Sequence, residues 1–295
     1  MEIGLLSVIT PVYKKEKTVC KELTDLHKTL SATGYKFEVI VVVDGTNLDN
    51  SLEEAKKCKL SNVRVYGYPT NHGKGQAVRF GMQKAKGDIV TFIDSGGDIN
   101  PQGITILLEH MKWYGADIIV ASKAHPASIV NYPISRRILS KGYYYFVKAL
   151  FGLKLRDTQT GLKIYKRSVL DKVLDRLVVK RFAFDIEILA VAHSLGYKRI
   201  YDGPVEVKWD FKDTTIWGVF TDNGIWNFVY DTISVWYRLK VLRYYKDKRK
   251  RTKVYDDELR MYVNTGDMTD KRQLLIRTVN KFIFKPFSST SSNKK

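Results

Sequence analysis

The feature that most constrains the fold is an alternation of short apolar runs with segments of helical spacing across the first hundred residues. The apolar runs are rich in β-branched residues and cover positions 5–10, 38–43, 63–66 and 89–93. Helical patterns separate them, at positions 16–32, 50–58 and 77–85. Strands that alternate with helices form a parallel sheet through right-handed crossovers. The sequence therefore predicts an α/β fold in which helices flank a mostly parallel central sheet.

Polar or turn residues follow each of the four apolar runs. They include Pro11, Asp44, Asn71 and Asp94, and Pro11 is expected to stop the first strand. Ligands of open parallel sheets bind in the crevice beyond the carboxyl ends of the strands. We therefore expect these four positions to face one binding crevice.

An acidic, glycine-rich turn follows the last of these runs. Asp94 closes the run, Asp98 lies four positions later, and Ser95, Gly96 and Gly97 separate the two carboxylates. Two carboxylates on such a turn suit a hard divalent cation that also holds a diphosphate. An isolated D-x-x-x-D is more often a solvated loop whose aspartates cap the next helix. The turn alone therefore leaves both interpretations open.

The loop of residues 71–77, NHGKGQA, opens the third helix. Its backbone N–H groups and Lys74 are suited to bind phosphate at a helix N-terminus, although an ordinary loop explains the pattern equally well. The spacing matches neither the P-loop nor the G-x-G-x-x-G fingerprint. Asp44 has a similar ambiguity, because a carboxylate there could cap a helix or accept from the N–H of a base.

Charge and composition limit the class of partner. The 295 residues include 50 basic and 31 acidic side chains, a net charge of +19 that favours an anionic partner. Cys20 and Cys58 suggest neither a disulfide framework nor a metal cluster, as expected in a reducing compartment. No uncharged apolar run reaches the roughly 18 residues that span a bilayer, so a soluble or peripheral protein is expected. Nucleic-acid-binding modules and the glycine-rich signature of nucleotidyltransferases are both missing from the sequence.

Four motifs occur in the order and spacing of family 2 nucleotide-sugar glycosyltransferases: TPVY at 10–13, VVVDGT at 41–46, NHGKGQAVR at 71–79 and FIDSGGD at 92–98. Three later motifs resemble the dolichyl-phosphate glucosyltransferase and mannosyltransferase branch, and the glucosyl members more closely: ASKAH at 121–125, RDTQTGLKIYKR at 156–167 and RFAFDIEIL at 181–189. The resemblance implies a GT-A catalytic domain over residues 1–212. It also implies inverting, metal-assisted transfer of a hexose from UDP-glucose, or from GDP-mannose, to dolichyl or polyprenyl phosphate.

The resemblance also implies site residues. The donor would contact Thr10, Pro11, Tyr13, Asp44, Lys74, Asp94, Gln159 and Asp185. Mg²⁺ or Mn²⁺ would bind Asp94 and Asp98, because Gly96 stands where the family has its second aspartate. The acceptor phosphate would contact Lys123, Arg136, Arg137 and Ser140. The residues of the chemical step would be Asp94, Asp98, Lys123 and Arg136.

Two of these assignments have structural alternatives. Residues 134–148 could form only a basic surface helix, and Asp185 with Glu187 could be a capping box or a hydrogen-bonded core pair. The nucleophile on a lipid phosphate is already ionised, so positioning and charge neutralisation should carry most of the rate. The alternative acceptor, a saccharide or protein for a soluble family 2 enzyme, would require a catalytic base.

The C-terminal third suggests how the protein meets a lipid. Apolar and aromatic residues recur at helical spacing from Trp226 to Tyr244, with basic residues between them. Residues 213–248 are therefore predicted to form amphipathic helices that bind an anionic membrane, with core packing as the alternative. Residues 249–295 are expected to be a basic, partly disordered extension. Together these features predict a peripheral protein on the cytoplasmic face of a membrane, held there by the helices, the basic tail or a membrane-anchored partner protein.

Overall fold

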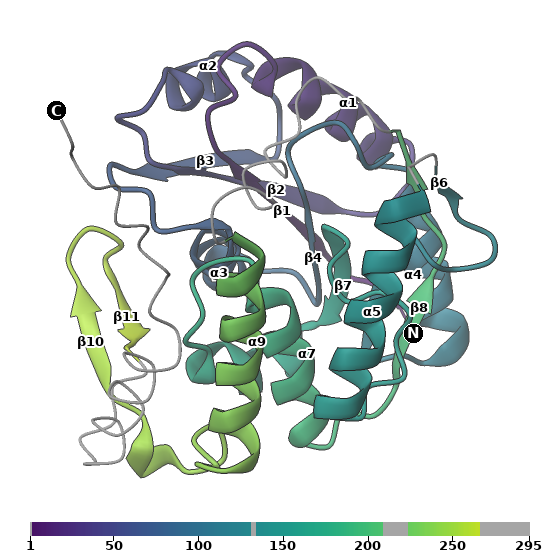
Figure 1. Cartoon of the computed structure of the whole chain (residues 1–295). Coiled ribbons are helices and arrows are strands. Elements are labelled where there is room, and N and C mark those ends of the chain that lie inside the picture. The colour runs from purple at the N-terminus through teal and green to yellow at the C-terminus, as the bar shows by residue number, and fades with distance from the viewer. Residues whose placement is uncertain (1, 131–133, 209–223, 266–295) are drawn as a thin grey trace, which may run out of the picture.

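The computed structural model describes residues 2–130, 134–208 and 224–265, and it is built around one seven-stranded sheet (Figure 1). The strand order is β3-β2-β1-β4-β7-β5-β8, and β7 runs antiparallel to both of its neighbours while the other pairs are parallel. The strands are β1 (Leu6–Val12), β2 (Phe37–Asp44), β3 (Val63–Tyr68), β4 (Ile89–Ile93), β5 (Ile118–Ala121), β7 (Leu162–Lys166) and β8 (Ile200–Gly203). The predicted α/β class is confirmed.

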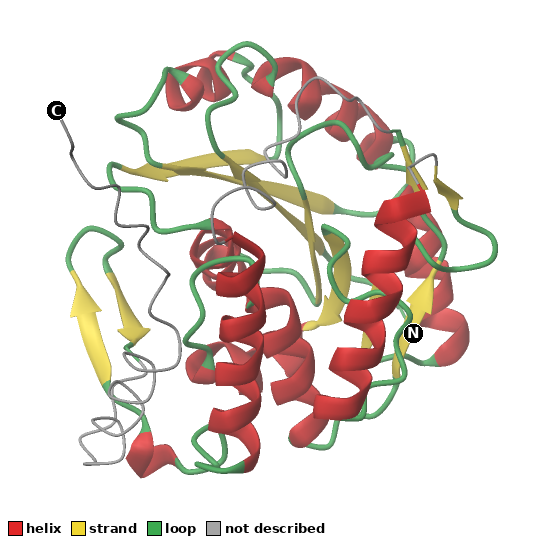
Figure 2. Ribbon diagram, in the orientation of Figure 1, coloured by secondary structure: helices red, strands yellow, loops and turns green. Residues whose placement is uncertain are grey.

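Two hydrophobic cores lie on opposite faces of the sheet because side chains alternate along each strand. In β2, Val39, Val41 and Val43 face one core while Ile40 and Val42 face the other. The first core contains residues from α1 (Val19–Ser31), α2 (Ser51–Lys57) and α4 (Gly103–Tyr114). The second contains residues from α3 (Lys74–Lys84), α5 (Ile134–Phe151), α6 (Arg167–Val173), α7 (Phe184–Ser194) and α9 (Gly224–Lys240). Figure 2 shows the resulting layers of helices around the sheet.

Pro11 does not stop the first strand, contrary to the prediction. β1 continues to Val12, and Pro11 pairs with Val42 of β2. The ladder between β1 and β4 ends earlier, at Ile9 and Phe92. Pro11 therefore lies where β1 pairs on one side only. A proline, which has no backbone N–H, is tolerated there because no strand on the other side requires that donor.

Two smaller sheets extend the fold. β6 (Ile129–Val130) pairs with β9 (Glu206–Val207) in parallel, and β10 (Lys253–Asp256) forms an antiparallel hairpin with β11 (Met261–Asn264). The hairpin falls within the predicted extension, and it contributes buried side chains to the second core. Residues 266–295 of that extension lie outside the described residues.

The predicted amphipathic region is partly described. Residues 213–223 lie outside the described residues, whereas α9 packs Val235 and Leu239 into the second core and exposes Ile233. This packing accounts for the apolar face of α9 in the way that the core-packing alternative predicted. Within the described part of the chain, we find no helix with the length and apolar character needed to traverse a bilayer.

Cys20 and Cys58 are paired in the structure, which corrects the expectation that they form no disulfide. Cys20 lies on α1 and Cys58 directly follows α2, and their Cα atoms are 5.6 Å apart. The pairing depends on the contact between α1 and α2, which the spacing of the two cysteines in the sequence does not show.

Candidate active site

The loop between β3 and α3 is fixed by Asp44 at the carboxyl end of β2. Asp44 is buried, and its two oxygens accept hydrogen bonds from the backbone N–H groups of His72 and Gly73, each at 2.8 Å. Gly73 has φ of 99°, and a Cβ atom there would lie 2.8 Å from the carbonyl oxygen of Lys180. This close approach requires glycine. Contact of Asp44 with a nucleotide base stays a prediction, and its described partners give it the role of ordering the loop that leads into Lys74.

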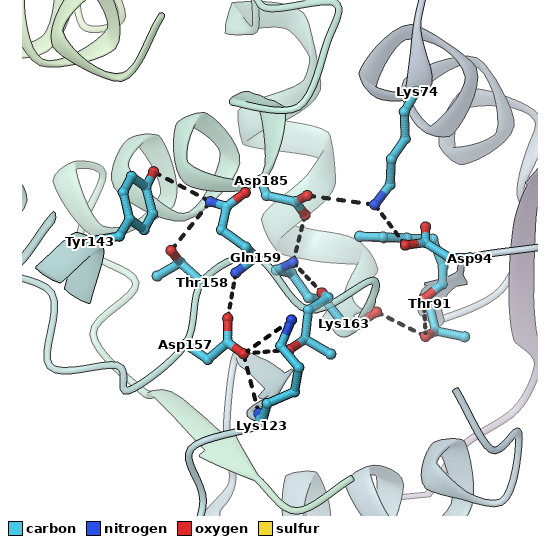
Figure 3. A network of polar contacts seen from close by, with 12 residues as sticks. Lys74, Thr91, Asp94, Lys123, Tyr143, Asp157, Thr158, Gln159, Lys163 and Asp185 are labelled. Carbon is cyan, nitrogen blue, oxygen red and sulfur yellow. Dashed lines mark hydrogen bonds and ion pairs between the residues drawn. The ribbon is translucent and has the colours of Figure 1, made fainter. Parts of the chain in front are cut away.

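Four charged side chains of alternating sign form the centre of the site (Figure 3). The Nζ atom of Lys74 lies 2.9 Å from Asp94 Oδ2 and 3.8 Å from Asp185 Oδ2. Asp185 Oδ1 in turn lies 2.5 Å from Lys163 Nζ. Burial opposes the charge on Lys74, but the two carboxylates outweigh it and raise the pKa of the ammonium group above its ordinary value. We name this cluster, Asp94, Lys74, Asp185 and Lys163, the charge network.

Lys163 is a site residue that the sequence analysis did not assign. It lies in β7, is fully buried, and donates both to Asp185 and to the carbonyl oxygen of Thr160 at 2.7 Å. Burial lowers the pKa of Lys163, and the neighbouring charge of Lys74 lowers it further, while Asp185 opposes both effects. A lysine in the apolar run LKIYK was the available signal, because a buried lysine needs a counter-charge.

Asp157 organises a second polar cluster beside the charge network. Its carboxylate accepts from the Thr160 hydroxyl at 2.6 Å and from the backbone N–H of Gln159 at 2.8 Å. It also lies 3.8 Å from Lys123 Nζ and accepts from the Lys123 backbone N–H at 3.2 Å. Burial would raise the pKa of Asp157, but Lys123 and the hydrogen bonds lower it below the ordinary value. Lys123, at the end of β5, is thus held next to the 157–160 segment.

Gln159 connects this segment to α5. Its side-chain amide donates to the Tyr143 hydroxyl at 3.5 Å and to the Thr158 hydroxyl at 3.3 Å. Tyr143 is partly buried, and desolvation raises the pKa of its hydroxyl. The predicted contact of Gln159 with a sugar stays a prediction, and its amide in this structure points toward Tyr143 (Figure 3).

The acidic turn faces the charge network. The Asp94 backbone N–H donates to the carbonyl oxygen of Gly161 at 3.0 Å, and its Oδ1 is buried and accepts no hydrogen bond from the described residues. Ser95 donates to the carbonyl oxygen of Pro11 at 2.5 Å, which joins the turn to the end of β1. A Cβ atom on Gly96 would lie 3.7 Å from Asp98 Oδ2, so the Asp98 carboxylate folds back over the turn.

These carboxylates fit a divalent cation that is completed by a substrate. Among the described residues, no group of three or more histidine, cysteine, aspartate or glutamate side chains is placed to hold a metal ion. The unpartnered Oδ1 of Asp94 and the nearby Asp98 offer one or two carboxylates, which is what Mg²⁺ uses when phosphates supply further ligands.

The remaining predicted residues differ in how well they are placed. Thr10 and Asp94 line a cavity of about 110 Å³, together with residues of the first half of α1. Pro11 is buried in β1, and Tyr13 beyond it is exposed. On α5, Ser140 is exposed, whereas the side chains of residues 136 and 137 lie outside the described part of the structure. The roles of Arg136 and Arg137 stay predictions.

Glu187 behaves as the core alternative predicted. It is fully buried and accepts from the backbone N–H groups of Val178 and Val179, at 2.9 and 3.0 Å, and from the Tyr245 hydroxyl at 2.7 Å. Burial raises its pKa despite these donors. Glu187 therefore fixes the segment that follows η1 (Leu174–Arg176) rather than facing the crevice.

The contact between Gly161 and Asp94 yields a testable prediction. A Cβ atom on Gly161 would lie 1.7 Å from Asp94 Oδ2, so the Gly161→Ala substitution must displace the carboxylate. We expect kcat/KM for glycosyl transfer to fall by about a hundredfold, within the range reported for misplaced catalytic groups. Gly142→Ala is the matched control, because nothing lies within 4 Å of its Cβ position on α5. Equal kcat/KM for the two variants would contradict this role of Gly161.

The fold is that of a glycosyltransferase of the GT-A class. Residues 7–174 match the family model Glycosyl transferase family 2, and the chain belongs to this family. It is 32% identical over 219 residues to a dolichyl-phosphate beta-glucosyltransferase of Drosophila melanogaster, covering 69% of this chain and 66% of that relative. It is 30% identical to the human enzyme of the same name, over 69% of this chain and 67% of that relative. The chain thus spans about two thirds of the length of these relatives.

Solved structures agree on the fold. Glucosyl-3-phosphoglycerate synthase from Mycobacterium tuberculosis, in complex with Mn²⁺, UDP and glucosyl-3-phosphoglycerate, aligns with a TM-score of 0.57 at 18% identity, over 88% of this chain and 86% of that one. The same enzyme with Mg²⁺ and UDP aligns with a TM-score of 0.58 at 16% identity, over 92% of each chain. At these identities the likeness concerns the fold alone, and it confirms the GT-A prediction.

Proposed function

We propose that this protein transfers glucose from UDP-glucose to dolichyl phosphate or another polyprenyl phosphate, with inversion at the sugar. The observation that carries the proposal is the charge network at the carboxyl end of β4 and the amino end of the antiparallel strand β7. It places one cation, Lys74, between two carboxylates beside an acidic turn. Such an arrangement suits a diphosphate and its metal ion. The names of the similar relatives support glucose and dolichyl phosphate, and the Mycobacterium structures support UDP.

In the proposed reaction, Lys74 binds and orients the donor diphosphate. Its Nζ atom lies next to Asp94, so it can exchange that partner for a phosphate oxygen. Asp185 is buried and held by Lys163, which keeps Lys74 at the edge of the crevice. Asp94 and Asp98 would hold Mg²⁺ or Mn²⁺, which supplies Lewis-acid stabilisation of the departing UDP when bound.

The acceptor side requires positive charge rather than a base. A phosphate oxygen is ionised near neutral pH and attacks the anomeric carbon directly, from the face opposite the departing UDP. Lys123 is held by Asp157 close to the site, and Arg136, Arg137 and Ser140 lie together on the first half of α5. We propose that these residues orient the lipid phosphate and offset its repulsion from the diphosphate. A saccharide or protein acceptor is the alternative.

Membrane attachment is part of the proposal. A net charge of +19 favours an anionic surface, and the basic residues of positions 213–248 are suited to the headgroup layer. We propose that the protein acts at the cytoplasmic face of a membrane, bound peripherally or through a membrane-anchored partner.

An assay with both donors tests the proposal. The purified protein is incubated with UDP-glucose or GDP-mannose, with Mg²⁺ or Mn²⁺, and with polyprenyl phosphate in anionic vesicles. Flotation of the vesicles at low salt measures binding of the protein to the membrane. We expect transfer from UDP-glucose that requires both the metal and the lipid phosphate, and protein that floats with the vesicles. Transfer to a saccharide without lipid phosphate would favour the alternative acceptor. Transfer from GDP-mannose but not from UDP-glucose would show that the proposed donor is wrong. Protein that does not float with the vesicles would show that it does not bind the membrane directly.

A further inference from the structure

The β10–β11 hairpin contacts the loop that leads into Lys74. Glu258, in the turn of the hairpin, accepts from the backbone N–H of Thr70 at 2.5 Å. Its other oxygen lies 3.4 Å from His72 Nε2. These contacts join segments 188 residues apart in the sequence. Figure 1 shows the hairpin beside α3 and α9, at the side of the molecule where that loop runs.

The hairpin packs against the catalytic fold, so its contacts with the loop can hold the loop in place. Leu259, Met261 and Val263 are buried in the second core. Asn264 accepts from the Tyr244 hydroxyl at 2.5 Å and donates to the carbonyl oxygen of Arg176 at 3.2 Å. These contacts hold the strands against the catalytic fold and place the turn next to residues 70–72.

The loop is therefore fixed from two sides. Asp44, at the end of β2, accepts from the backbone of His72 and Gly73, while Glu258 accepts from Thr70 and faces the His72 ring. That ring also packs against Tyr68 in a T-shaped arrangement, with 5.3 Å between centroids. The two carboxylates together fix the backbone immediately before Lys74, whose position sets the charge network.

We propose that Glu258 is a positioning residue for the nucleotide diphosphate, acting through the β3–α3 loop. The inference rests on the proposed function, because it assumes that Lys74 and the loop bind the donor. Glu258 itself is an anion and would repel a phosphate, so its contribution comes from holding the loop. Removing its carboxylate leaves the Thr70 N–H and the His72 ring without this partner and allows Lys74 to move relative to Asp94.

Calorimetric titration of UDP into the full chain, in the presence of Mn²⁺, tests this role. We expect Glu258→Ala to raise the dissociation constant of UDP by about tenfold, as loss of a charged hydrogen-bond acceptor would, while the KM for polyprenyl phosphate stays within about twofold. Glu258→Gln, which keeps one acceptor oxygen, should show a smaller rise. Lys253→Met is the control, because Lys253 pairs with Asp175 at the other end of the hairpin, 2.6 Å away. This variant should bind UDP like the unsubstituted protein.

The outcomes separate this role from the proposed function. If the unsubstituted protein does not bind UDP, the donor assignment is wrong and the role of Glu258 is lost with it. If it binds UDP and Glu258→Ala binds equally well, only the role of Glu258 is overturned. Equal losses in Glu258→Ala and Lys253→Met, or a parallel rise in the acceptor KM, would show a general effect of the hairpin on folding and would also overturn it. Thermal unfolding of each variant shows that binding is measured on folded protein.

Discussion

The Asp94→Asn substitution is expected to lower kcat/KM for glycosyl transfer by about a thousandfold, the upper end of losses seen when one preorganised electrostatic group is removed. Asp94 is the carboxylate that pairs with Lys74 and whose other oxygen has no hydrogen-bond partner among the described residues, so the proposed cation could bind there. Asparagine preserves the size of the side chain but removes its charge. The variant should therefore bind the divalent ion poorly and leave Lys74 without its partner. Initial rates at several Mn²⁺ concentrations measure the effect.

One control and one further variant define this result. Asp88→Asn removes a carboxylate at the opposite end of the same strand, where Asp88 accepts from the Leu5 backbone, and should leave kcat/KM nearly unchanged. Asp98→Asn tests the second carboxylate of the turn and should raise the Mn²⁺ concentration needed for half-maximal rate. Full activity in Asp94→Asn would disprove a role of this carboxylate in metal binding and in the reaction.

The second large effect concerns stability. The Lys163→Met substitution is expected to lower the free energy of unfolding by roughly 3–5 kcal/mol, the usual result of removing one partner of a buried ion pair. Lys163 and Asp185 are both buried and 2.5 Å apart, and methionine fills a similar volume without a charge. The Asp185 carboxylate would then have only Lys74, 3.8 Å away, as a described counter-charge. Urea unfolding followed by circular dichroism measures the loss.

A double substitution separates charge from packing. Lys163→Met with Asp185→Asn removes both charges, so a large part of the lost free energy should return. A double variant as unstable as Lys163→Met alone would show that the cost comes from packing around β7. Lys166→Met, which alters a partly exposed lysine of the same strand paired with Asp117 at 3.4 Å, should cost much less.

Most of the fold could be predicted from local patterns. The runs that became β1, β2 and β4 were recognisable because a strand buried on both faces is almost continuously apolar. The antiparallel direction of β7 was not predictable, since strand direction depends on how the chain returns to the sheet and not on the strand's composition. The position of Pro11 inside β1 was missed for a related reason. A proline is tolerated there because β1 pairs only with β2 at that point, and the sequence does not show where the pairing with β4 ends.

The candidate site was predictable where its residues follow strands. Asp44, Lys74 and Asp94 were assigned from their motifs, and the structure brings Lys74 and Asp94 together. The sequence alone did not show that the oxygens of Asp44 are used by the loop, or that Lys163 is buried against Asp185. Partners of this kind come from segments distant in the chain.

The sequence by itself determined the α/β class, the family and the acidic turn, because periodicity and ordered motifs are properties of contiguous residues. Only the tertiary structure decided which charges meet: Lys163 with Asp185, Lys123 with Asp157, and Glu258 with the loop before Lys74. The physical reason is that an ion pair or hydrogen bond depends on distances of a few ångströms across packed elements. The order of residues along the chain does not fix those distances until the sheet and its helices are assembled.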